Sequence, residues 1–288
     1  MTSNGLPVLY VKNNENGRFS LNYYFDCGEE WNKWLPYAAD YLDYLGTDKL
    51  SAEQLKQKFY QLACDFDISI GSKKSSIALR GLSENMTKAM ALMEDFIAHA
   101  QVDTAAFTQY AALEMKGRAD NKLDQQNNFS ALQAYSVYGA YNPVRNIPSA
   151  QEFEQIDPQE LVDLIRNLSN YKHTVLYYGP MNLDEVTVSV DRYHKTAAIL
   201  ADAPVGKPYT LQPTPANEVF IAPYDAKNIY MMQYHNENHP WNADRQPVIA
   251  LFNEYFGGGM NTIVFQELRE ARGLAYSAGA SYVTPAYK

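Results

Sequence analysis

Arg269 and Tyr276 are the two side chains of this sequence best suited to act on a peptide. They lie seven residues apart in the run FGGGMNTIVFQELREARGLAY, residues 256–276. A guanidinium and a phenol hydroxyl both donate hydrogen bonds, so together they suit a peptide carbonyl that gains negative charge during hydrolysis. We therefore predict that Arg269 and Tyr276 bind substrate. The plainer alternative is a solvated charge at a helix end and a half-buried tyrosine on a strand.

Two glycine turns are expected to bring this pair together. Apolar residues in 248–256 recur at helical spacing, and three glycines then end that helix. A second amphipathic helix follows, and Gly273 stands where a left-handed cap residue is expected. Alternation over 274–283 predicts a strand. Arg269 would lie one turn before Gly273 and Tyr276 three residues after it, so the turn can direct both side chains towards one place.

The glycine run fits neither of the common nucleotide-binding loops. It lacks the Lys-Ser/Thr ending of a P-loop, and Thr262 stands where a dinucleotide fingerprint needs glycine. The run instead resembles the signature of the pitrilysin/insulinase-type (M16) zinc metallopeptidases, a glycine-rich turn followed by L-R-E-x-x-G-L-A-Y. In that family the signature lies in the half without zinc, and its Arg and Tyr hold substrate in the other half's active site. The resemblance implies these roles for Arg269 and Tyr276.

The zinc motif of the family is missing from this chain. Catalytic halves carry H-x-x-E-H on the first helix after the opening strands, where two His bind zinc and the Glu activates water. Here residues 37–41 read Tyr-Ala-Ala-Asp-Tyr, and no His precedes His99. Glu114, on the helix that would give a third ligand, is then expected to be a solvated carboxylate. We predict no catalytic residue, metal or other cofactor in this chain, with zinc in a partner half.

The remaining metal-like patterns are weaker. His235 and His239 are spaced as on a helix face around Glu237, but Pro240 follows at once and the preceding residues alternate like a strand. We expect a polar loop there. Two cysteines are too few for a disulfide framework or a thiolate zinc site.

Length and charge narrow the class of protein. The 288 residues suffice for about two domains. A net charge of -9 and a pI near 5.1 argue against nucleic acid or an anionic membrane as partner. No apolar run approaches the roughly 18 residues of a membrane span, and the first residues do not have signal-peptide composition. We expect a soluble protein, cytoplasmic or periplasmic, whose compartment the sequence leaves unknown.

The order of elements predicts an α+β fold. Residues 6–27 alternate around Asn16-Gly17 and are expected to form a hairpin. Further strands are expected near 66–70, 77–79 and 173–179, with helices near 34–45, 51–64, 84–99, 103–118, 127–139, 158–168 and up to 195. Strands with helices inserted between them indicate an antiparallel or mixed sheet that is covered by helices on one face.

A segment with four prolines, 201–217, is expected to be a stiff linker. The opening pattern then repeats, with two alternating runs over 218–235 and a helix that ends at Gly257 as the earlier one ends at Gly46. We therefore predict a complete M16-like domain over 1–200 and the first part of a second copy over 218–288. The incomplete copy would expose a strand edge and an apolar face, which favours self-association.

Three functions remain open. The chain is a non-catalytic half or fragment of a zinc metallopeptidase, a structural or assembly subunit, or a peptide-binding module without proteolysis. The retained spacing of Arg269 and Tyr276 favours the first. Its partners would be a zinc-bearing half, in the same polypeptide or as a separate subunit, and a peptide substrate.

Overall fold

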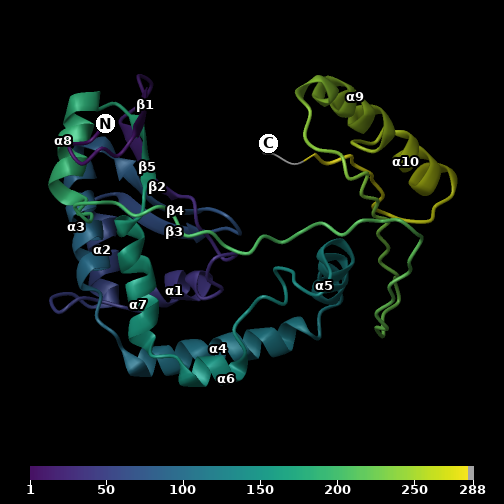
Figure 1. The fold of residues 1–288 in the computed structure, drawn as a ribbon, viewed down its shortest axis with the longest axis horizontal. Helices are drawn as coiled ribbons and strands as arrows, with labels where there is room; N and C mark the ends of the chain where they lie inside the picture. Colours follow the sequence, from purple (N-terminus) through teal and green to yellow (C-terminus); the bar gives the residue numbers. More distant parts are fainter. Residues whose placement is uncertain (285–288) are drawn as a thin grey trace. The chain divides into compact units, whose positions relative to one another are not determined.

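The computed structural model describes residues 1–284, and the chain divides into two compact units (Figure 1). The first unit contains Met1–Gln212 together with Glu218–Tyr234. The second contains Pro213–Asn217 and the segment from His235 onward. No helix within the described residues is long and apolar enough to cross a membrane.

A five-stranded mixed sheet forms the centre of the first unit. Its strands are β1 (Val8–Lys12), β2 (Arg18–Phe25), β3 (Cys64–Ile70), β4 (Ser75–Leu82) and β5 (His173–Gly179), in the spatial order β1-β5-β2-β4-β3. β1 runs parallel to β5, and the other neighbouring pairs are antiparallel. The α+β class and the mixed sheet are thus confirmed.

The hairpin predicted for residues 6–27 is wrong in its pairing. β1 and β2 do not bond to each other, because β5 lies between them and pairs with both. The reason is burial: Val175 and Tyr177 of β5 are fully buried, and a strand of this kind is most stable inside a sheet. A pattern of local alternation cannot reveal a partner that lies about 150 residues later in the chain.

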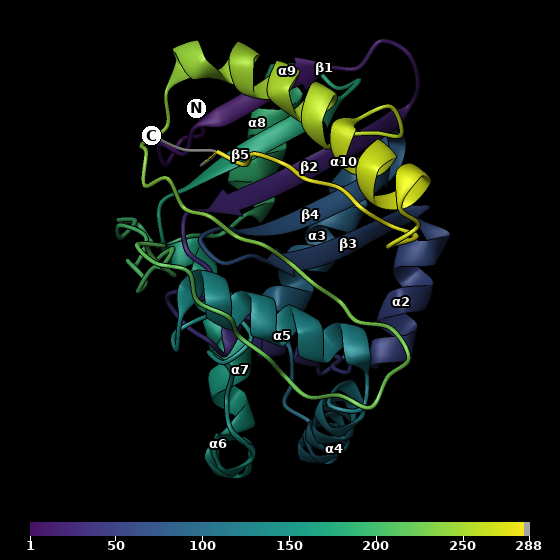
Figure 2. The same cartoon turned by 90° about the vertical axis from the view of Figure 1, so that its right-hand side faces the viewer.

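Helices cover one face of this sheet, as expected. The helices of the first unit are α1 (Leu35–Leu42), α2 (Ala52–Gln61), α3 (Met86–His99), α4 (Thr104–Asn121), α5 (Gln125–Tyr138), α6 (Ala150–Gln155), α7 (Pro158–Arg166) and α8 (Leu183–Tyr193), and of these α1, α2 and α3 contact β3 or β4. Alternate residues of β2, from Phe19 to Phe25, are buried in the core beneath α1, α3, α7 and α8. Figure 2 shows α3 and α8 behind the sheet. On the opposite face Leu9, Val11 and Tyr178 remain exposed.

Local capping explains where several helices begin. Ser51 and Gln54 form the expected capping box of α2, and Asp157 caps α7 with Pro158 at its first position. The short helix α6 was not predicted, although Ser149 and Glu152 form a capping box of the same kind.

The start of the linker is bound to the first unit. The main-chain N–H of Lys207 donates to the carbonyl of Glu30 at 2.9 Å, and that of Gln212 donates to Val137 at 2.7 Å. Gly206 allows this close approach, because a Cβ there would lie 2.3 Å from the Glu30 carbonyl carbon. Residues up to 212 therefore do not form a free spacer.

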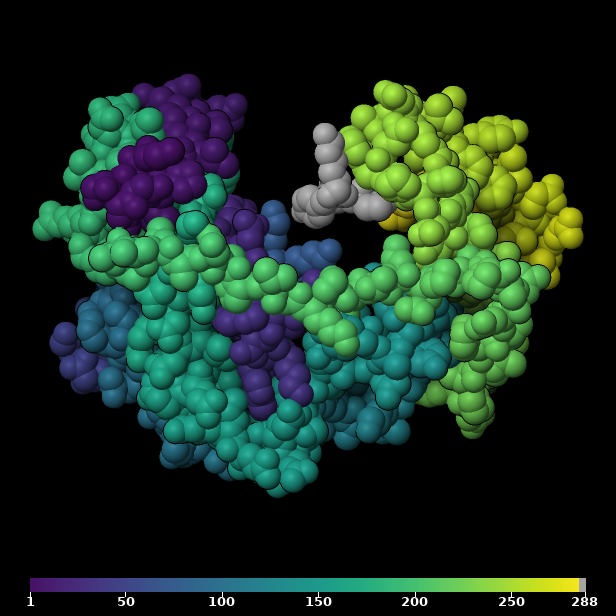
Figure 3. Space-filling model, viewed as in Figure 1, coloured from purple at the N-terminus to yellow at the C-terminus, as the bar shows by residue number. Residues whose placement is uncertain are grey.

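Residues 218–234 form an extended segment beside α5, drawn in green at the surface in Figure 3. Tyr230 packs on Phe129 with ring centroids 5.5 Å apart, and Phe220 packs on Tyr135 at 5.7 Å. The predicted strands over 218–235 are not formed in the described residues, because no neighbouring strand pairs with them. The second M16-like copy therefore stays a prediction.

The second unit is built on helix α9 (Gln246–Phe256), which ends near Gly257 as predicted. After it come the short helix α10 (Ile263–Phe265) and the π-helical turn η4 (Gln266–Ala271). The predicted strand over 274–283 is not formed. Instead, the Asn253 side chain on α9 hydrogen-bonds both main-chain groups of Tyr282, at 2.7 and 3.0 Å, and binds the segment as an extended chain.

We expect residues 218–284 to drive self-association. Val219, Ile221 and Ile229 are each at least 80% exposed, and Leu251 on α9 is 71% exposed, so a large apolar area meets water. Light scattering at increasing concentration should show reversible oligomers, and Leu251→Glu should shift them towards monomer. Leu113→Glu, at an exposed apolar position on α4, is the matched control and should not. A monomer at all concentrations contradicts this expectation.

Candidate functional site

Arg269 lies on η4, and the chain reverses direction directly after it. The N–H of Gly273 donates to the carbonyl of Arg269 at 3.0 Å, and the N–H of Leu274 donates to that of Leu268 at 2.8 Å. Gly273 has a φ of +57°, so it is the left-handed cap residue expected from the sequence. The two nested bonds return the chain past the end of the turn and bring Tyr276 back towards Arg269.

The structure brings Arg269 and Tyr276 into contact. The guanidinium carbon of Arg269 lies 4.6 Å from the centre of the Tyr276 ring. It also lies 4.8 Å from the centre of the Phe265 ring, one turn earlier. Both distances are typical of cation–π contacts. Arg269 therefore meets the ring of Tyr276, whereas the sequence suggested two polar tips pointing at a common target.

Both side chains remain available to an external ligand. Tyr276 is 85% exposed, and the Arg269 side chain is 35% exposed. The only ion-pair partner of Arg269 among residues 1–284 is the neighbouring Glu270, with Nε and Oε1 3.5 Å apart. An exposed pair of this length holds a guanidinium weakly. The N–H groups of Arg269 can thus bind an incoming carbonyl or carboxylate.

The position of the missing zinc motif is filled by tyrosines and an arginine. On α1, the buried Tyr41 donates through its hydroxyl to the carbonyl of Asp103 at 2.8 Å. Tyr37 accepts a hydrogen bond from Arg118 on α4 at 3.0 Å. Burial raises the pKa of Tyr37 above its ordinary value, and burial with the nearby Asp43 carboxylate raises that of Asp40. Neither phenol is therefore prepared to lose its proton and bind a metal.

Arg118 supplies the positive charge in this region. Its Nε donates to Glu114 at 2.7 Å, and another nitrogen donates to the carbonyl of Pro148. Its guanidinium carbon lies 5.2 Å from the Phe153 ring and 5.4 Å from the Tyr37 ring. Glu114 is thus a partly buried, paired carboxylate, and the prediction that it is solvated is wrong. The i,i+4 spacing of Glu114 and Arg118 was the signal in the sequence that could have shown this.

The residues near α1 do not suit a zinc ion. Two protonated phenols and one carboxylate paired with a fixed guanidinium are a poor donor set for Zn²⁺, and the guanidinium would repel a second cation. No group of three or more His, Cys, Asp or Glu in residues 1–284 is arranged to hold a metal. His235 and His239 lie on a loop, as expected, with Asn238 in the left-handed conformation between them.

Residues 155–287 match the family described as the peptidase M16 inactive domain. This part of the chain is therefore similar to the inactive domain of M16 peptidases. This match includes the whole signature run and agrees with the non-catalytic half that the sequence indicated. The M16 zinc motif is replaced, as described above, on α1.

Solved M16 structures share the fold. The peptidase M16 inactive domain from Pseudomonas fluorescens is 17% identical, with a TM-score of 0.70 over 98% of this chain and 70% of that one. A protease from Helicobacter pylori is 13% identical, with a TM-score of 0.64 over 96% and 69%. A curated relative from Rickettsia felis, named an uncharacterized zinc protease, is 23% identical over 96% of this chain and 68% of its own length.

Proposed function

We propose that this chain is a non-catalytic M16 half, or part of one, that presents Arg269 and Tyr276 to a peptide held by a zinc-bearing half. The observation that carries the proposal is the stacked guanidinium of Arg269. It contacts two aromatic rings, while its N–H groups are held only by the 3.5 Å pair with Glu270 among residues 1–284. A fixed donor with free hydrogens is what stabilises charge that develops on a carbonyl oxygen.

Zinc in the partner half would supply the activated water. The residues of this chain would then bind and orient the substrate. Arg269 donates to the peptide carbonyl oxygen, and the Tyr276 ring holds the guanidinium in place while its hydroxyl faces solvent and the approaching chain. The zinc protease name of the relatives supports a peptide as substrate.

The proposal is tested by combining this chain with a zinc-bearing M16 half that carries H-x-x-E-H. Alone, this chain should show no peptide hydrolysis and no stoichiometric zinc by elemental analysis. The mixture should hydrolyse a quenched fluorescent peptide library at least tenfold faster than the zinc-bearing protein alone. An equal rate with and without this chain would favour the alternative, an assembly subunit that takes no part in proteolysis.

A further inference from the structure

Four side chains form a buried hydrogen-bonded chain in the first unit. The Tyr23 hydroxyl on β2 donates to Oε1 of Glu94 on α3 at 2.8 Å, and the same oxygen lies 2.8 Å from Nδ1 of His194 at the end of α8. Nε2 of His194 lies 2.9 Å from Nε2 of His173, the first residue of β5. Nδ1 of His173 lies 2.6 Å from the Tyr171 carbonyl oxygen. Both imidazoles are at most 6% exposed.

The number of protons shared by these hydrogen-bonded side chains follows from the geometry of their hydrogen bonds. A carbonyl oxygen only accepts, so Nδ1 of His173 carries a hydrogen. A second hydrogen must lie between the two Nε2 atoms, and a third between Nδ1 of His194 and the Glu94 carboxylate. Two neutral imidazoles and one carboxylate carry only two. The complete chain therefore holds one additional proton, which is most simply placed on His194 as an imidazolium paired with Glu94.

Loss of that proton would leave two facing lone pairs in the core. They would lie either between the imidazoles or between His194 and Glu94, where an unsatisfied polar contact is costly. The Tyr23 ring stacks on the His194 ring with centroids 4.0 Å apart, which further favours a cationic imidazole.

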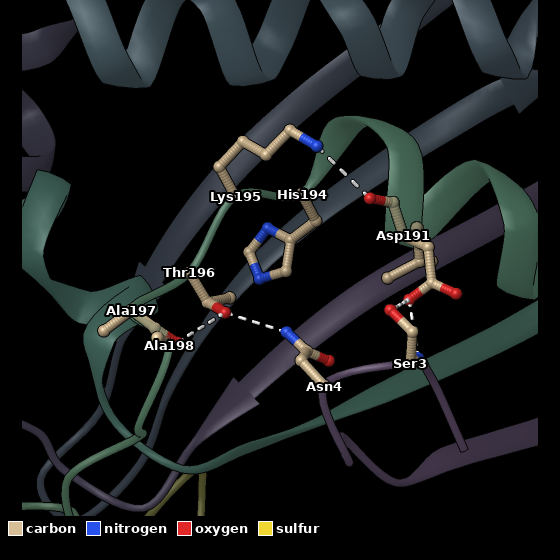
Figure 4. A pocket seen from close by; sticks show the side chains of 9 residues that line it. Ser3, Asn4, Asp191, His194, Lys195, Thr196, Ala197 and Ala198 are labelled. Carbon is tan, nitrogen blue, oxygen red and sulfur yellow. Dashed lines mark hydrogen bonds between the residues drawn. The ribbon is translucent and has the colours of Figure 1, made fainter.

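Solvent reaches His194 through a pocket of about 190 Å³ (Figure 4). Two charged residues line this pocket beside His194: Asp191 in the last turn of α8, and Lys195 directly after His194. Ser3 and Asn4 of the N-terminal segment also line it and carry no side-chain charge. Glu94 from α3, Tyr23 from β2 and His173 from β5 are the titratable groups that face the imidazole in the core.

The start of the linker is bound next to these hydrogen-bonded side chains. The N–H of Lys172 donates to the carbonyl of Ala201 at 2.7 Å, and the N–H of Ala201 donates to the carbonyl of Asn170 at 3.0 Å. His173 follows directly. The contact between His173 and His194 thus closes the loop from β5 through α8, just before the polypeptide leaves for the second unit.

We propose that the Glu94–His194–His173 chain is a proton-dependent clasp. With its third proton it holds the end of α8 and the start of the linker against β5, and it loosens both when that proton leaves. This is independent of the proposed peptidase role, because neither Arg269 nor the second unit takes part.

The sign of the pH dependence follows from proton counts. In the unfolded protein, His titrates near pH ~6.5 and Glu near ~4.3. Above neutrality, His173, His194 and Glu94 together therefore carry two protons in the unfolded protein and three in the folded protein. Protection of this segment against hydrogen exchange should therefore fall as the pH rises. The fall is about tenfold per pH unit where the folded protein carries one proton more than the unfolded protein.

At acidic pH, the stability of this segment depends on pH in the opposite direction. Burial lowers the pKa of His173 to about 4; the hydrogen bond to the Tyr171 carbonyl opposes this shift, and the adjacent His194 charge adds to it. Its contribution is thus complete above about pH 6.5, the unfolded value, and is lost as the pH falls towards that folded value. The segment should be most stable near neutral pH.

Hydrogen exchange of residues 173–201 in the full chain, corrected for intrinsic rates, tests the proposal between pH 6.5 and 9. The wild-type protein should lose about tenfold in protection per pH unit. Glu94→Gln should be nearly independent of pH, because an amide N–H can donate to Nδ1 of a neutral His194. Asp95→Asn is the control: its exposed pair with His99 lies on the same helix, at 3.0 Å, and should follow the wild type.

Equal slopes in the wild type and Glu94→Gln would overturn the clasp. A second readout does not depend on any variant folding. At pH 7.5, ¹⁵N NMR of the histidine side chains should show three protonated ring nitrogens across His173 and His194. Two protonated nitrogens, one on each ring, would mean that the additional proton is absent.

Discussion

Replacing Arg269 with alanine should lower kcat of the assembled peptidase about ten- to a thousandfold and change KM much less. In the proposed role its guanidinium donates to the carbonyl oxygen as charge develops there during attack, and an interaction made only in the transition state is lost from kcat. Steady-state hydrolysis of a peptide by the mixture of both halves measures the two constants separately.

Arg272→Ala is the matched control. Arg272 lies three residues further on, its side chain is 65% exposed, and it pairs with Glu267 at 3.3 Å; within residues 1–284 it stacks on no aromatic ring. It should leave turnover within about twofold of the wild type, as a surface charge does. Equal losses in both arginine variants would show a general effect of charge, and unchanged turnover in Arg269→Ala would make Arg269 a solvated helix-end residue.

Two substitutions at position 276 separate the ring of the tyrosine from its hydroxyl. Tyr276→Phe keeps the surface on which Arg269 stacks, at 4.6 Å, and removes only the hydroxyl. Tyr276→Leu removes both. A loss in Tyr276→Phe assigns the hydroxyl to the substrate, whereas a loss confined to Tyr276→Leu means that the ring acts by holding the guanidinium.

The turn around Gly273 could be predicted from the sequence because it depends only on residues close to it along the chain. A glycine after a helical run, followed by an aromatic residue, determines the reversal that places Tyr276 near Arg269. The stacked geometry was not predictable in this way. It also requires Phe265 one turn earlier, and the pattern of apolar residues alone assigns such a phenylalanine to the core.

Long-range pairing was the main source of error. The strands of the opening segment were recognised, but the insertion of β5 between β1 and β2 depends on a segment that follows seven intervening α-helices. Alternation over 218–235 likewise indicated strands, yet a strand forms only where a neighbour accepts its hydrogen bonds. Alternation therefore shows which residues could form a sheet, and the partner is decided by burial elsewhere in the chain.

Removing Arg118 should destabilise the first unit more than any exposed charge does. Arg118→Met keeps most of the side-chain volume but leaves Glu114 partly buried without its cation, and Tyr37 loses its hydrogen-bond donor. Hydrogen bonds to charged groups contribute about 1.5–3 kcal/mol each when part of a buried network, so we expect a loss of about 2–4 kcal/mol. Urea unfolding followed by circular dichroism measures it.

Lys172→Met is the matched control for this change. Lys172 and Asp202 are 2.5 Å apart, closer than the 2.7 Å between Arg118 and Glu114, but their side chains are 65% and 86% exposed. Breaking that exposed pair should leave the urea midpoint almost unchanged. The double variant Arg118→Met, Glu114→Gln should be more stable than Arg118→Met alone, because no carboxylate is then left without its partner. If Arg118→Met costs no more than Lys172→Met, the guanidinium beside Tyr37 is not what stabilises the region where catalytic M16 halves bind zinc.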